Sequence, residues 1–152
     1  MTNYICINGN KTELTPEQLK QLGIEIPKAN PFERANYGKR FYRLGYDGDV
    51  YMEFEKHAYL HDDMFNIANY CTDKSIMEQR ALHETLNRLL WRYAMENGGE
   101  GKWEICHNGK GFVVQNAIYK YFGQTFSTGK IAENAINEIV KPFMEAHPDF
   151  KF

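Results

Sequence analysis

The stretch "KRFYRLGYDGDVYMEFEK", residues 39–56, carries the clearest structural signal in the chain. Two runs rich in aromatic and β-branched residues flank Asp47-Gly48. An Asp-Gly dipeptide between two runs of this kind is typical of a tight turn that joins antiparallel strands. The stretch therefore predicts a β-hairpin. A second stretch, "KWEICHNGKGFVVQN" at 102–116, predicts another hairpin that turns at Asn108-Gly109.

A helix is expected after each hairpin, because apolar residues recur there at helical spacing. The first runs from about Asp73 to Asn97 and ends at "NGG". Its expected buried face consists of Leu82, Leu86, Leu89 and Tyr93, widened by Leu90 and Ala94. The last helix begins near Thr128, and Pro142 should kink or end it. Its expected buried stripe consists of Ile131, Ala135, Ile139 and Phe143.

The residues before the first hairpin predict a strand and a short helix. "NYICING" at 3–9 is typical of a strand, and Thr15 with Gln18 predicts a capping box at the start of a helix that ends by Gly23. Residues 24–38 contain two prolines and predict an extended linker. Residues 57–71 are ambiguous between a loop with a short strand and a helical turn.

These elements predict an α+β fold in which short antiparallel β-hairpins pack with two or three helices. We expect one compact domain over residues 1–152, with a strand and helix at 1–26 and hairpin–helix units at 38–97 and 102–146.

Two segments hint at a repeat, "NYCTDKSIMEQRAL" at 69–82 and "QTFSTGKIAENAIN" at 124–137. Matching positions are Thr72 with Ser127, Ile76 with Ile131, and Glu78 with Glu133. Either the chain contains two ββα pseudo-repeats, or two unrelated helices use the same capping chemistry.

The composition limits the classes of function. The formal net charge is −2, which argues against both a strongly basic DNA binder and an acidic DNA mimic. No basic region followed by an apolar one opens the sequence, and the apolar runs are too short for a bilayer, so we expect a cytoplasmic protein. Cys6, Cys71 and Cys106 form no CxxC pair, and we expect buried free thiols in a reducing cytosol.

No catalytic motif is present, so we expect neither an enzyme nor a cofactor. His57 and His61 stand four residues apart before Asp62-Asp63. They could share a metal on a helix, but no further ligands follow at a familiar spacing, and a polar loop is the favoured interpretation. Cys71 precedes a helix and is a candidate nucleophile with His57 or His83, although no flanking signature supports it.

Basic and aromatic residues alternate in three stretches, "KRFYR" at 39–43, "KWE" at 102–104 and "YKYF" at 119–122. Strands of this kind can anchor a protein partner, or stack bases and neutralise phosphates. The plain alternative is a core on one face and solvated charge on the other. The candidate partner-binding residues are Arg40, Tyr42, Arg43, Trp103, Tyr119 and Tyr121.

The ordered set of features resembles a family of small, mostly uncharacterised phage and prophage proteins of Gram-positive gut bacteria. The resemblance rests on "LTPEQLKQLGI", "NPFERANYGKRFYRLGYDGDVY", "NIANYCTDKSIMEQRALHETLNRLLWRYAMENGG" and "FSTGKIAENAINEIVKPFMEAHPDF". It covers nearly the whole chain. It concerns fold and capping and transfers no catalytic residue.

The resemblance implies a phage-encoded protein that binds a host protein in the bacterial cytoplasm. The leading hypothesis is an inhibitor of a host defence factor, such as a CRISPR effector nuclease, that acts by steric occlusion. The second hypothesis is a nucleic-acid-binding module that uses the same strands. A small enzyme using Cys71 or the His57–His61 region, and a self-associating virion protein, remain as further alternatives.

Overall fold

The computed structural model describes residues 4–7, 10–23, 30–117 and 124–151. Their contacts divide the chain into two compact units, Met1–Glu33 and Arg34–Phe152. We expected one compact domain, and that expectation stays a prediction.

The first unit contains a hairpin and a short helix. Strands β1 (Tyr4–Ile7) and β2 (Asn10–Glu13) pair antiparallel, and helix α1 (Pro16–Gln21) follows. Thr15 and Gln18 form the predicted capping box. Strand β2 was not predicted, because all four of its side chains are exposed and it therefore lacks the alternation of apolar and polar residues that marks a half-buried strand.

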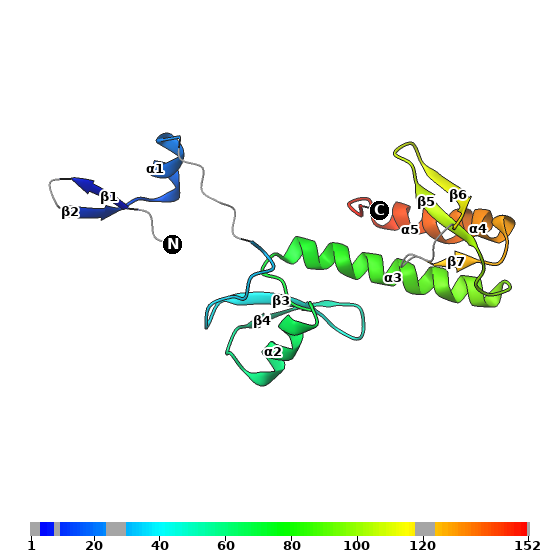
Figure 1. Ribbon diagram of the computed structural model, residues 1–152, viewed down its shortest axis with the longest axis horizontal. Helices are drawn as coiled ribbons and strands as arrows, with labels where there is room; N and C mark the ends of the chain where they lie inside the picture. The colour runs from blue at the N-terminus through cyan, green and yellow to red at the C-terminus, as the bar shows by residue number, and fades with distance from the viewer. Residues whose placement is uncertain (1–3, 8–9, 24–29, 118–123, 152) are drawn as a thin grey trace. The chain divides into compact units, whose positions relative to one another are not determined.

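The second unit begins with the predicted central hairpin (Figure 1). Strand β3 (Arg40–Leu44) pairs antiparallel with β4 (Val50–Phe54), and Gly48 adopts the left-handed φ of +94° that the turn needs. Helix α2 (Tyr59–Asn66) then occupies the segment that was ambiguous in the sequence. Helix α3 (Lys74–Glu96) follows within one residue of the predicted bounds at each end, and Asp73 caps it by accepting a hydrogen bond from the Ser75 N–H.

The long helix α3 contributes to two separate cores. Near its start, Met77 and Ala81 pack with Leu44 and Cys71 beneath the hairpin. Further along, the helix packs into the C-terminal core with Leu86, Leu90, Tyr93 and Ala94. The hairpin β3–β4 accordingly lies near one end of α3 and the C-terminal sheet near the other (Figure 1).

The C-terminal part is a three-stranded antiparallel sheet covered by a helix. Strands β5 (Trp103–His107), β6 (Phe112–Asn116) and β7 (Thr125–Phe126) lie in the order β6-β5-β7. The stretch "AIYKYFGQTFS" at 117–127 predicts a further strand; β7 covers the end of this stretch, and residues 118–123 lie outside the described residues. Gly101 lies so close to β7 that a Cβ there would meet the Phe126 carbonyl oxygen at 2.5 Å, so only glycine fits.

The last helix continues past Pro142, contrary to a simple helix end. It runs as α4 (Gly129–Ala135), a π-helical turn η1 (Ile136–Val140) and α5 (Lys141–Ala146). A π turn widens the helix and is one way to accommodate a proline that lacks the N–H of a regular turn. The predicted Ala135 and Phe143 are buried, whereas Ile131 and Ile139 are only half-buried. Three further residues of this helix, each one position after a residue of the predicted stripe, are also buried: Ala132, Ile136 and Val140.

The α+β class and the order hairpin–helix, hairpin–helix are confirmed. The two hairpin–helix segments differ in detail, since α2 stands between the first hairpin and α3, and β7 stands between the second hairpin and α4. Internal duplication stays a hypothesis. None of the helices in the described parts of the chain combines the length and the apolar character needed to cross a bilayer.

Candidate functional site around Glu55

The second unit buries a charged side chain, Glu55, directly after β4. The alternation of the strand explains its position, because Glu53 and Glu55 point to the same face of the hairpin as Phe41, which is cross-strand partner to Glu53. Helix α2 and Tyr70 cover this face: Phe41 stacks on Tyr70 with ring centroids 4.1 Å apart and meets the His61 ring edge-on at 5.0 Å. Glu55 is 0% exposed as a result.

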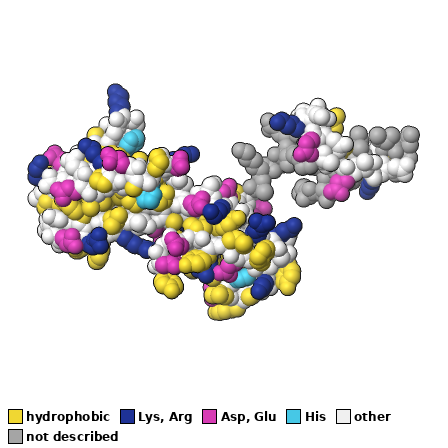
Figure 2. All heavy atoms as spheres, turned by 180° about the vertical axis from the view of Figure 1, so that it is seen from behind, with side chains coloured by type: hydrophobic (Ala, Val, Ile, Leu, Met, Phe, Trp, Pro, Cys, Tyr) yellow, Lys and Arg dark blue, Asp and Glu magenta, His cyan; other side chains and the backbone are white. Residues whose placement is uncertain are grey.

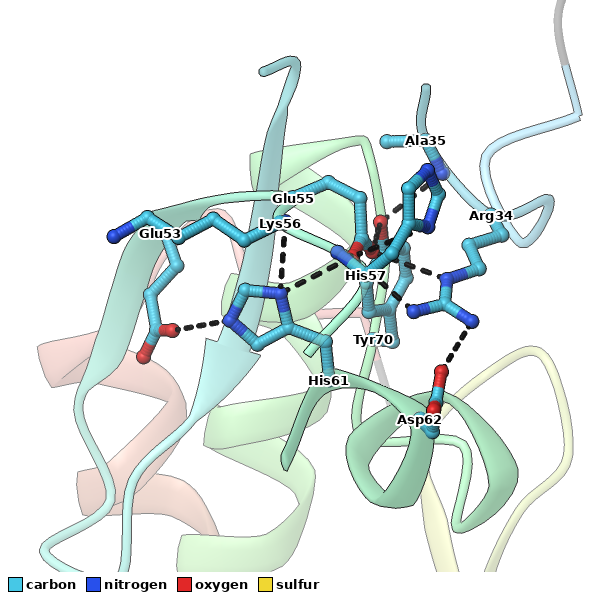
Figure 3. Close-up of polar contacts among 9 residues, drawn as sticks. All are labelled: Arg34, Ala35, Glu53, Glu55, Lys56, His57, His61, Asp62 and Tyr70. Atoms are coloured by element: carbon cyan, nitrogen blue, oxygen red, sulfur yellow. Dashed lines mark hydrogen bonds and ion pairs between the residues drawn. The ribbon is translucent and has the colours of Figure 1, made fainter. Parts of the chain in front are cut away.

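Four residues donate hydrogen bonds to the Glu55 carboxylate (Figure 3). The guanidinium of Arg34 binds both oxygens, Nε to Oε2 and Nη2 to Oε1, at 3.2 Å each. The Tyr70 hydroxyl donates to Oε2 at 2.8 Å, and the His57 backbone N–H donates to Oε1 at 2.6 Å. His61 Nδ1 lies 3.1 Å from Oε1. We call these five residues the Glu55 cluster.

The cluster joins four segments of the chain. Arg34 comes from the segment before β3, His61 from α2, and Tyr70 from the connection between α2 and α3. The Ala35 N–H donates to the Tyr70 hydroxyl at 3.0 Å, and Arg34 also pairs with Asp62. Residues 34 and 35 were expected in a linker, but these bonds hold them against the hairpin.

The electrostatics of the cluster favour an ionised Glu55. Burial alone would raise the pKa of this carboxyl, but the hydrogen bonds from Arg34, Tyr70, His57 and His61 outweigh burial and lower the pKa to about 2. Burial and the bond to Glu55 raise the pKa of the Tyr70 hydroxyl to about 12, so this hydroxyl stays protonated and donates a hydrogen bond to Glu55.

The proton position on His61 follows from the charge of Glu55. The Lys56 N–H lies 3.2 Å from the same Nδ1, but one nitrogen cannot both accept from Lys56 and donate to Glu55. The bond to the ionised carboxylate is charge-assisted and stronger, so Nδ1 carries the proton. The other ring nitrogen, Nε2, faces Glu53 Oε2 at 3.4 Å. The His61 ring therefore lies between two carboxylates.

His57 completes the cluster through its backbone. Its φ of +51° is unusual for a residue with a side chain, and this left-handed conformation is held by the short bond from its N–H to Glu55. Its imidazole is half exposed, with Nδ1 3.6 Å from Glu55 Oε1.

This arrangement is suited to structural support. Both Glu55 oxygens are occupied by donors and the carboxylate is a weak base, so it cannot easily take a substrate proton. Within the described residues, no three His, Cys, Asp or Glu side chains are grouped so that they could hold a metal ion. In this structure, His57 and His61 both bind the Glu55 carboxylate.

Cys71 lacks the surroundings of a nucleophile. It is buried beneath the hairpin, where its backbone bridges to Tyr42, and burial raises the pKa of its thiol. Cys106 is half-buried, whereas Cys6 is exposed, so the expectation of three buried thiols is wrong for Cys6. The reason is that β1–β2 is a small hairpin whose described side chains are exposed.

Around the buried cluster, the same part of the unit exposes large apolar side chains (Figure 2). The exposed fractions are 98% for Tyr46, 81% for Tyr59, 69% for Ile67 and 59% for Leu60. These four residues, called the apolar surface below, come from the hairpin turn and from α2 with its C-cap. A hollow of about 320 Å³ lies between Tyr46 and Ile67.

The four predicted partner-binding residues that the structure describes lie on two different sheets. On β3, Arg40 is exposed, Tyr42 is half-buried against the core beneath the hairpin, and Arg43 pairs with Glu53 and lies over the Tyr51 ring. On β5, Trp103 packs against the C-terminal core. Tyr119 and Tyr121 lie outside the described residues. Residues 40–43 are thus brought together, whereas Trp103 belongs to a separate sheet.

Comparisons with protein-family models, with curated proteins and with solved structures found no match to this chain.

Acid should weaken this part of the protein. A carboxyl whose pKa is lower when folded stabilises the protein fully above its unfolded pKa, 4.5 here, and stops doing so as the pH falls through about 2. We expect Glu55 to account for a loss of about 3 kcal/mol in the free energy of unfolding over this window. Urea unfolding measured from pH 6 to pH 2 checks this, with the Glu55→Gln variant as control, because its curve should lack that part of the slope.

Proposed function

We propose that the chain is a protein-binding protein without catalytic activity that contacts its partner through the apolar surface, Tyr46, Tyr59, Leu60 and Ile67. The observation that carries the proposal is the exposure of these large side chains around a core that is already closed. Tyr46 stands on a hairpin turn and is almost fully exposed, so folding does not explain its aromatic ring. Tyrosine is enriched among the anchors of protein interfaces, and neighbouring aliphatic side chains add apolar area to the contact.

The helix α2 supports a continuous contact. Leu60 and Ile67 are seven residues apart and therefore share one face, with the half-buried Met64 between them. That face leads to the hollow beside Tyr46, which is also lined by Leu44, and Arg80 and Glu84 form its polar rim. An apolar strip that ends in a hollow with a polar rim resembles the anatomy of a binding site for a protein side chain.

The Glu55 cluster supplies the rigidity that such a surface needs. Arg34, Tyr70 and His61 fix α2 and the preceding segment to the hairpin through one carboxylate. A surface that is ordered before binding loses less entropy on association.

For the partner, we propose a host defence factor such as a CRISPR effector, with the chain acting as a phage-encoded inhibitor by steric occlusion in the host cytoplasm. The resemblance to phage and prophage proteins supports this step. Arg40, Tyr42, Arg43 and Trp103 remain predicted secondary contacts, of which Arg40 is the most accessible.

Nucleic-acid binding is less well supported by the charges of the described residues. Arg43 pairs with Glu53, Arg34 with Glu55 and Asp62, and both Arg80 and Arg88 with Glu84. These arginines are therefore neutralised locally, whereas a phosphate-binding strand needs an excess of basic charge.

The first test is affinity capture with the tagged chain from a lysate of a related bacterial host, with and without nuclease treatment. A defence or nuclease complex retained after nuclease treatment supports the proposal and identifies the target. Capture that disappears with nuclease favours the nucleic-acid alternative.

The second test locates the contact with purified target. Tyr46→Ala with Ile67→Ala should weaken binding by at least about tenfold, because interface anchors of this kind each contribute on the order of 1–2 kcal/mol. Trp91→Ala is the matched control, since Trp91 is also an exposed aromatic residue but lies on α3. Equal affinities of the double variant and the control would exclude the apolar surface as the contact.

A further inference from the structure

The outer edge of strand β4 is open. β3 and β4 form a two-stranded sheet, and the outer edge of β3 is closed by a bridge in which Tyr42 and Cys71 exchange N–H···O bonds of 2.7 and 3.0 Å. Among the described residues, no strand pairs with the other side of β4. An open edge offers unpaired backbone groups to another strand.

The register shows which backbone groups point outward. Residues opposite each other in an antiparallel pair alternate between those that bond each other and those that do not. Since Tyr42 directs its N–H and C=O toward Cys71, its cross-strand partner Met52 directs its own groups away from β3. By the same alternation, the backbone N–H and C=O groups of Val50 and Phe54 also point away from β3.

These three positions are self-complementary. If a second β4 lies antiparallel with Met52 opposite Met52, then Val50 of each copy falls opposite Phe54 of the other, and all three pairs can exchange backbone hydrogen bonds. The side chains of all three residues lie on one face, so the pairing would bury Met52 and Phe54, which are 47% and 50% exposed. We propose that two copies of this chain associate along β4 into a four-stranded antiparallel sheet.

The surroundings of the edge fit a second copy. Next to Val50 lies a hollow of about 440 Å³, lined also by Ala81 and Leu82 of α3, and the pairing places the partner's Phe54 beside it. Lys56 follows β4 by two residues, and the same register brings it level with the partner's hairpin turn, next to the exposed Asp49. Apolar and charged groups are therefore complementary in the same register.

The pairing does not depend on the proposed function, because it needs no other protein. Sedimentation velocity of the full chain over a range of concentrations should show a species of twice the monomer mass. Met52→Lys places two ammonium groups opposite each other at the symmetry axis and should abolish that species. Tyr59→Lys introduces the same charge at a residue of α2 that is more exposed than Met52, and it should leave that species intact. Circular dichroism establishes that both variants are folded.

Cross-linking gives a second, geometric measurement. Paired Met52 residues would have Cα atoms about 5.5 Å apart, within the range that a disulfide spans. In a Cys6→Ser background, which removes the exposed native thiol, Met52→Cys should form a disulfide-linked dimer on mild oxidation, and Tyr59→Cys should not. A monomer at all concentrations, a dimer that survives Met52→Lys, or equal cross-linking of both cysteine variants would overturn the proposal.

Discussion

Replacing Glu55 by glutamine is expected to lower the free energy of unfolding by about 3 kcal/mol. The amide keeps the size of the side chain but removes its charge, so the Arg34 guanidinium loses its bidentate partner and one amide –NH₂ faces donors. If the glutamine oxygen takes the Oε1 position and still accepts from the His57 N–H, the –NH₂ group faces the two donors of Oε2, which are Arg34 Nε and the Tyr70 hydroxyl. Urea unfolding followed by far-ultraviolet circular dichroism measures the change.

Glu53→Gln is the matched control for this experiment. Glu53 lies in β4 and, like Glu55, has an arginine and His61 as partners, but its side chain is 27% exposed. Water can replace part of what is lost there, and we expect a change of about 1 kcal/mol or less. Equal losses for the two variants would contradict the central role assigned to Glu55.

Replacing Phe126 by alanine is expected to cost about 4 kcal/mol in the free energy of unfolding. Phe126 is 0% exposed and lies in the C-terminal core with Leu86 and Leu90 of α3. The backbone around it cannot easily collapse into the cavity, because β7 is paired to Trp103 and packed against Gly101. The same urea titration, at the same pH, measures the loss.

Trp91→Ala serves as the control, because Trp91 is another large aromatic residue near the C-terminal core but is 53% exposed on α3. Its removal leaves no closed cavity and costs only the area that is half-buried, and we expect a change of about 1–2 kcal/mol. If Phe126→Ala were as mild as this control, β7 would not be an integral part of the core.

The elements with strong local signals were predictable from sequence. Both hairpins turn where Asp47-Gly48 and Asn108-Gly109 indicated, because turn chemistry and alternating strands are encoded within a few neighbouring residues. Helix α3 was also predictable, since its apolar spacing extends over many turns. Helix α2 was not, because its outward face carries Tyr59 and Leu60 and thus lacks a simple division into apolar and polar sides.

The Glu55 cluster was not predictable, because its contacts depend on tertiary structure. Arg34 and Tyr70 lie 21 and 15 residues from Glu55, and no local motif connects them. The available signal was alternation, which places Glu55 on the same face as Phe41 and therefore toward the interior. The spacing of His57 and His61 is compatible with a shared metal ion, but in the structure both contact the carboxylate of Glu55, which spacing alone does not reveal.

Because α3 is shared between two cores, its amide protons should not exchange with solvent as one cooperative block. The turns around Met77 and Ala81 depend on the hairpin, and those around Leu86 and Leu90 depend on the C-terminal core. Segments that rest on different packing open with different free energies. Glu55→Gln should therefore speed deuterium uptake in the first turns of α3, whereas Phe126→Ala should speed it in the later turns.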